Sequence, residues 1–176
     1  MTQDLGFHVV NDRNLPVRAG VPLVLGAGDD RVLVTSNLLA YNGLPIPVVR
    51  LGAGDDRVGG GPAIVYGEDG HDTFSLSGVF EPPYEAFAGV THALAYGGAG
   101  NDSFTDFGGS TIAYGGAGDD VWTNLFVTTR ALPGDDDRAF LGHGNDIATV
   151  VFSRTDPTTP TQLEDRVIHL DGGAGR

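Results

Sequence analysis

The sequence predicts an all-β fold, a right-handed parallel β-roll or β-solenoid whose coils share one column of glycine- and aspartate-rich turns. Three observations predict it: a GGxGxD-like segment recurs along the chain, short stretches of alternating apolar and polar residues flank the copies, and no segment shows helical periodicity. The expected organisation is an N-terminal capping segment over residues 1–21 and a β-roll over residues 22–176.

The repeat has the pattern glycine, glycine, any residue, glycine, any residue, aspartate, any residue, apolar, numbered here as positions 1 to 8. Position 1 is leucine in some copies. The six copies are Leu25–Val32, Leu51–Val58, Gly67–Phe74, Gly97–Phe104, Gly115–Trp122 and Leu141–Ala148. A degenerate copy lies at Pro133–Asp137, and a seventh at Gly172–Arg176 stops within the motif, which suggests a chain truncated inside a repeat.

The spacing of the copies predicts how they are arranged. The aspartates at position 6 are separated by steps of 26, 16, 30, 18 and 26 residues. The shortest steps fit one coil of two short strands and two turns, and the longer ones add loops such as residues 81–84 and 156–160. We therefore expect a single column of motif turns along one edge and variable turns, such as residues 107–110, along the other.

The strands follow from the residues around each motif. The apolar residue at position 8 should begin a strand and point into a thin core, in the order Val32, Val58, Phe74, Phe104, Trp122 and Ala148. A returning strand should end just before the glycines, at Leu25, Leu51, Tyr66, Tyr96, Tyr114, Leu141 and Leu170. Residues 103–107 and 110–114 show the two-residue alternation of such strands.

The composition indicates a cationic partner. The chain has 28 glycines among 176 residues, no lysine, and a formal net charge of -13. Without a basic patch, nucleic acid and anionic membrane surfaces are disfavoured as partners. A hydrophobic content of 40% exceeds that of a disordered acidic tail. The absence of cysteine excludes disulfides and thiolate zinc sites.

Each motif residue suits a turn that holds Ca²⁺. Glycine permits positive φ and close backbone approach, and Ca²⁺ takes six to eight oxygens from carboxylates and backbone carbonyls. The carboxylate candidates are Asp30, Asp56, Asp72, Asp102, Asp120 and Asp146, with Asp136 from the degenerate copy. The carbonyl candidates lie at the position-4 glycines Gly28, Gly54, Gly70, Gly100, Gly118 and Gly144. We expect Asp29, Asp55 and Asp119, at position 5, to face solvent.

This pattern resembles the nonapeptide of the RTX (repeats-in-toxin), or haemolysin-type, calcium-binding repeat family, from about Leu25 onward. The resemblance implies several Ca²⁺ ions held between turns of adjacent coils, folding coupled to Ca²⁺ binding, and type I secretion to the outside or the surface of a bacterial cell. It implies a structural or adhesive module, with calcium ions, further repeats or end-to-end copies as partners, and no nucleic acid or membrane insertion.

Alternatives from other classes remain open. The HExxH, GxSxG and P-loop signatures are missing, so no enzyme is expected. Parallel β-solenoids also host polysaccharide lyases and epimerases, and such an enzyme, or its carbohydrate-binding module, is the alternative. Tyr66, Tyr96 and Tyr114 share a register that suits either a structural ladder or the stacking of sugar rings. The five histidines lack zinc-like spacing and should be surface or loop residues.

Overall fold

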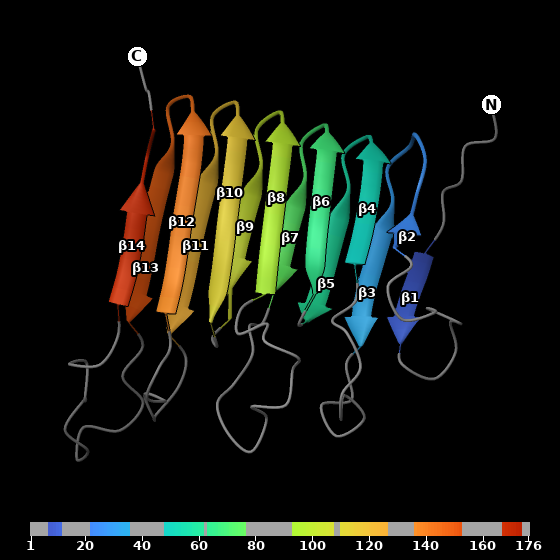
Figure 1. Cartoon of the computed structure of the whole chain (residues 1–176), viewed down its shortest axis with the longest axis horizontal. Helices are drawn as coiled ribbons and strands as arrows, with labels where there is room; N and C mark the ends of the chain where they lie inside the picture. The colour runs from blue at the N-terminus through green and yellow to red at the C-terminus, as the bar shows by residue number, and fades with distance from the viewer. Residues whose placement is uncertain are drawn as a thin grey trace.

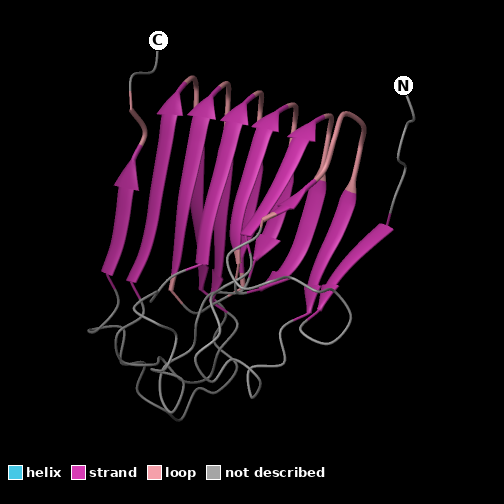
Figure 2. Ribbon diagram, turned by 45° about the vertical axis from the view of Figure 1, so that its right-hand side comes forward, coloured by secondary structure: helices cyan, strands magenta, loops and turns pink. Residues whose placement is uncertain are grey.

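The computed structural model describes residues 7–11, 22–35, 48–61, 63–76, 93–107, 110–126, 136–152 and 167–173. These residues form two parallel seven-stranded sheets that face each other, with strands stacked coil upon coil (Figures 1 and 2). Within them there is no helix long and apolar enough to cross a membrane. The expectation of an all-β protein with parallel sheets is therefore confirmed.

The chain alternates between the sheets. One sheet, called sheet A here, contains β1 (Phe7–Asn11), β3 (Arg31–Thr35), β5 (Arg57–Gly61), β7 (Thr73–Leu76), β9 (Ser103–Asp106), β11 (Val121–Phe126) and β13 (Ile147–Phe152). The other, sheet B, contains β2 (Leu23–Val24), β4 (Val48–Ala53), β6 (Ile64–Asp69), β8 (Ala93–Ala99), β10 (Thr111–Ala117), β12 (Asp136–His143) and β14 (Val167–Asp171). Neighbours within each sheet are two strands apart in sequence, as a solenoid requires.

The core is a set of columns of like residues between the sheets. Val32, Val58, Phe74, Phe104 and Trp122 occupy equivalent places on sheet A, and each is at most 3% exposed. The Phe74 and Phe104 rings stack with centroids 4.8 Å apart. These five inward positions are as predicted. Ala148 takes the equivalent place beside Trp122 but is exposed, because its strand β13 has a described neighbour on one side only.

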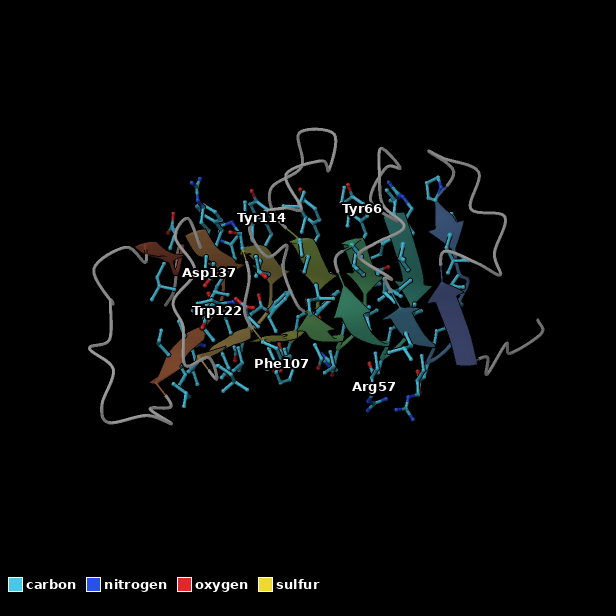
Figure 3. All side chains as sticks on the ribbon, turned by 90° about the horizontal axis from the view of Figure 1, so that it is seen from below. Arg57, Tyr66, Phe107, Tyr114, Trp122 and Asp137 are labelled. Atoms are coloured by element: carbon cyan, nitrogen blue, oxygen red, sulfur yellow. The ribbon has the colours of Figure 1, made fainter. Side chains whose placement is uncertain are left out.

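The tyrosine row forms a ladder on the outer face of sheet B (Figure 3). Ring centroids are 4.8 Å apart from Tyr66 to Tyr96 and from Tyr96 to Tyr114, and Phe140 extends the row at 5.2 Å. Arg50 covers the free face of Tyr66, 4.9 Å from its centroid. Because the ring faces lie against one another, they are not presented to a sugar, and the structural reading of this row is confirmed.

Three expectations need adjustment or fall outside the described residues. The sheet B strands do not end before the glycines but run through them, as β8 does to Ala99. The predicted capping segment includes β1, which pairs in parallel with β3 and so extends sheet A. The predicted loops at residues 81–84 and 156–160 lie outside the described residues.

Candidate metal centre

The six motif turns form one column along one edge of the solenoid, which we call the turn column. Each turn joins a strand of sheet B to the next strand of sheet A, as between β8 and β9. The turn backbones are joined to one another: the Gly70 N–H donates to the Ala99 carbonyl, and the Ser103 N–H donates to the Asp72 carbonyl. Connections at the other edge, the loop edge, run largely through residues outside the described ranges (Figure 1).

Glycine at position 4 is required by the stacking of the turns. All six of these glycines have φ between 131° and 153°, where other residues are strained. A Cβ added to Gly100 would also overlap the Gly70 carbonyl, and one on Gly118 would overlap the Gly100 carbonyl. Each position-4 carbonyl thus points at the next turn, so the turns pack at backbone contact.

The aspartates at position 6 form a buried hydrogen-bond ladder through the column. From Asp56 onward, each Oδ1 accepts from the backbone N–H of the equivalent aspartate in the preceding coil, at 2.7 Å from Asp30 to Asp56 and 2.8 Å from Asp72 to Asp102. The complete ladder runs Asp30, Asp56, Asp72, Asp102, Asp120, Asp146. The first five are at most 3% exposed, so the predicted carboxylates are brought together, one per coil, inside the edge.

The second oxygen of these carboxylates is left without a hydrogen bond. Oδ2 is buried and unpartnered in Asp56, Asp72, Asp102, Asp120 and Asp146. In three coils this oxygen occupies the place where position 1 would carry a Cβ, which is why position 1 is glycine there. A Cβ on Gly67 would overlap both Asp72 Oδ2 and the Gly97 carbonyl oxygen.

The same pairing recurs in the next two coils. At Gly97 the overlapping atoms are Asp102 Oδ2 and the Gly115 carbonyl, and at Gly115 they are Asp120 Oδ2 and the Leu141 carbonyl. A buried carboxylate oxygen therefore faces a carbonyl oxygen of the following coil three times. An unpartnered carboxylate oxygen beside a carbonyl oxygen forms an oxygen pair suited to a cation.

Four carboxylates of the ladder have raised pKa values. Burial raises the pKa of Asp72 to about 7 and that of Asp120 to about 6. Burial also raises the pKa of Asp56 and of Asp102. The ladder hydrogen bonds oppose these shifts, while the neighbouring carboxylates add to them at Asp56, Asp72 and Asp120. Ionising these buried carboxylates is therefore unfavourable, and binding of either a proton or a cation would offset the free-energy cost.

Position 5 forms a second ladder that the sequence did not predict. Asp29, Asp55 and Asp119 are exposed as expected, yet their carboxylates accept from the position-5 backbone N–H of the following coil, at 2.8–3.0 Å. His71 and Asn101 make the same bond through Nδ1 and Oδ1, at 2.7 and 2.9 Å. The sequence contains the information needed to predict this ladder, since Asp, Asn and His at position 5 all carry a short side-chain acceptor.

The donor set of the turn column fits a hard cation held between coils. In the described part of the chain no three His, Cys, Asp or Glu side chains cluster, so an ion there would take few carboxylates and complete its shell with carbonyl oxygens. Carbonyls at position 1, which the sequence did not single out, lie beside three of these carboxylates. Asp136 begins β12 at the loop edge, so the structure does not bring it into the column.

Comparison of the chain with family models, curated proteins and solved structures finds no match.

Proposed function

We propose that this chain is a non-enzymatic calcium-binding repeat module that completes its folding when Ca²⁺ enters the turn column. The observation that carries the proposal is the row of buried, unpartnered Oδ2 atoms, three of which face a carbonyl oxygen of the next coil. Ca²⁺ accepts mixed carboxylate and carbonyl shells of flexible geometry, whereas Mg²⁺ demands a near-ideal octahedron. The resemblance of the motif in this chain to the RTX repeat also supports Ca²⁺ as the ion.

Coupling of binding to folding follows from the charge of the column. Four carboxylates with raised pKa values lie in one buried row, in a chain with a formal net charge of -13. Each independent ion adds on the order of 2.7 kcal/mol at a free concentration about 100-fold above its Kd. Three such ions would match the whole stability of a small domain, roughly 5–15 kcal/mol.

The proposed setting is extracellular. A module that needs Ca²⁺ would stay unfolded at low cytosolic Ca²⁺ and fold after export, where affinities of roughly 10⁻⁴–10⁻³ M suffice. We propose a secreted or cell-surface protein in which this module is a structural or adhesive scaffold. The polysaccharide-active alternative gains no support from the turn column, because its first five ladder aspartates are at most 3% exposed and out of reach of a bulky substrate.

The test is far-UV circular dichroism of the chain in EGTA during titration with Ca²⁺, with Mg²⁺ as the control ion. The expected result is a transition from coil to β-structure that Ca²⁺ produces and Mg²⁺ does not. A β-rich spectrum that EGTA leaves unchanged would contradict the proposal.

A matched pair of variants locates the effect. Asp102→Asn keeps an Oδ1 acceptor for the ladder but removes the charge beside Gly97, so it should shift the Ca²⁺ midpoint upward. Asp119→Asn makes the same change at an exposed position-5 residue and should leave the midpoint nearly unchanged.

A further inference from the structure

A second group of polar side chains lies between the sheets, at the strand ends nearest the loop edge. Asp106 and Asn124 are register neighbours on β9 and β11 of sheet A, and Thr111 and Asp137 come from β10 and β12 of sheet B. All four are at most 4% exposed. Figure 3, seen from the loop edge, places Asp137 between the two rows of strands, with Trp122 beside it. We call these four residues the interior cluster.

One nitrogen atom, Asn124 Nδ2, is hydrogen-bonded to both carboxylates. Asn124 Nδ2 donates to Asp106 Oδ2 at 3.0 Å and to Asp137 Oδ2 at 2.8 Å, and the Thr111 N–H donates to Asp137 Oδ1 at 3.1 Å. The amide thereby bridges the two sheets. Both hydrogen-bond donors are uncharged, and their bonds lower the cost of burying the two carboxylates.

Two further oxygens of the cluster have no hydrogen bond. Asn124 Oδ1 and Thr111 Oγ1 are both buried and unpartnered. The two ends of an amide have nearly the same shape, so a half-turn of the Asn124 side chain exchanges Oδ1 with Nδ2. After that exchange Oδ1 would face both carboxylates, an arrangement that is repulsive alone and favourable around a cation.

We propose that the interior cluster is a binding site for one hard divalent cation, with Ca²⁺ as the first choice. Two carboxylates, an amide carbonyl and a hydroxyl give a donor set made only of oxygen, which suits Ca²⁺, Mg²⁺ or Mn²⁺ and disfavours softer metals. The ion would join β9 and β11 to β10 and β12 across the core. The site is separate from the turn column and shares no ligand with it.

The same columns are apolar in the N-terminal half, which shows that the fold itself does not require polar residues here. On sheet A the register places Leu76 next to Asp106, with Val34 further along the same column. On sheet B it places Ala93 next to Thr111. Leu76, Val34 and Ala93 are each at most 2% exposed. The change to acidic and amide side chains is confined to the C-terminal coils.

The test counts bound Ca²⁺ per chain by equilibrium dialysis of the full chain, wild type against the double variant Asp106→Asn/Asp137→Asn. Both substitutions preserve size and remove charge. The expected result is one ion fewer per chain, with the Ca²⁺-induced β-spectrum retained. An unchanged ion count in the folded double variant would overturn the proposal, since the carboxylates would then be held by protons.

A second variant covers the case in which the double variant fails to fold. Thr111→Val removes only the unpartnered hydroxyl at constant shape, and it should weaken one ion by about tenfold, the loss expected for one polar contact. Unchanged affinities for every ion in Thr111→Val would also overturn the site.

Asp102→Asn, in the turn column, separates this inference from the proposed function. A count that falls in the interior variant but not in Asp102→Asn supports the interior site and rejects the turn site at that aspartate. The reverse pattern rejects the interior site. A wild-type chain that binds no ion rejects both.

Discussion

The two edges of this solenoid place polar groups inside in different ways. At the turn column the same aspartate recurs in every coil, hydrogen-bonded to its equivalent in the coil before, and is at most 3% exposed in the first five coils. At the loop edge the inward column of sheet A is apolar at Leu76, polar at Asp106 and Asn124, and apolar again at Val150. The first arrangement is a property of the repeat, and the second belongs to particular coils.

This difference indicates what each edge contributes. A repeated bond between equivalent residues sets the stacking of every coil, so damage at one turn affects the packing on both sides. A local cluster ties together only the strands that carry it. The four predictions below test this distinction, from the largest expected effect to the smallest.

Gly100→Ala should cause the largest loss. The new Cβ would overlap the Gly70 carbonyl at φ 131°, and backbone strain together with overpacking costs roughly 2–6 kcal/mol. Urea denaturation in Ca²⁺ measures the loss. Gly59→Ala is the matched control, because its Cβ would meet nothing closer than 3.9 Å, and it should be neutral or slightly stabilising. Equal losses in both variants would contradict a special role for the turns.

Asn124→Leu tests the loop edge. The substitution keeps approximate volume but removes the donor shared by Asp106 and Asp137, and leaving buried charges without that donor costs about 3 kcal/mol. Urea denaturation in Ca²⁺ at neutral pH should show the loss. Leu76→Met, in the apolar part of the same column, should cost less than about 1.5 kcal/mol. A neutral Asn124→Leu would show that the amide bridge contributes nothing.

The pH dependence of stability should reverse when Ca²⁺ is added. Four turn carboxylates have raised pKa values, Asp72 to about 7 from 3.8, so the folded chain binds more protons than the unfolded chain in this interval. In EGTA their contribution is therefore greatest below about pH 4 and is lost as the pH rises through about 7. In Ca²⁺ the ionised form is the ligand, so stability should rise over the same interval. Far-UV circular dichroism across this pH interval tests this in both buffers. The β-signal should grow toward acid in EGTA and toward neutral pH in Ca²⁺, and identical profiles would contradict it.

Asp119→Ala should have the smallest effect. It removes the exposed acceptor for the Asn145 backbone N–H and for Asn145 Nδ2, bonds that together contribute about 1 kcal/mol. Asp119→Asn retains an oxygen acceptor and should remain close to wild type in urea denaturation. A loss as large as that of Gly100→Ala would mean that the exposed ladder matters as much as the stacking of the turns.

The repeat made the turn edge predictable, and its absence left the loop edge unpredicted. A motif that returns with Asp at one position and glycine at another specifies one turn geometry, so the single column and the inward residues up to Trp122 followed from the alignment. Asp106 and Asn124 belong to no copy of the motif, and Asp137 only ends the degenerate one. Their meeting depends on which strands face each other across the core, and a sequence pattern does not encode that.

Two local features depend on the neighbouring coils. β5 contains the glycines Gly59, Gly60 and Gly61, a composition that indicates a loop, yet it pairs in register with β3 and β7. Ala148 has the motif position of a core residue, but burial in a solenoid also requires a coil on each side. Residue composition and motif position are properties of a single coil. Strand pairing and side-chain burial depend on the coils on either side of it.

The two ladders of the turn column run in opposite senses. A position-6 side chain accepts from the coil before it, and a position-5 side chain accepts from the coil after it. Every coil thus offers one acceptor forward and one backward, and equivalent positions always meet. A whole coil could be duplicated or deleted by recombination without leaving any ladder group unmatched, so this architecture can change its length in steps of one repeat while each surviving junction stays the same.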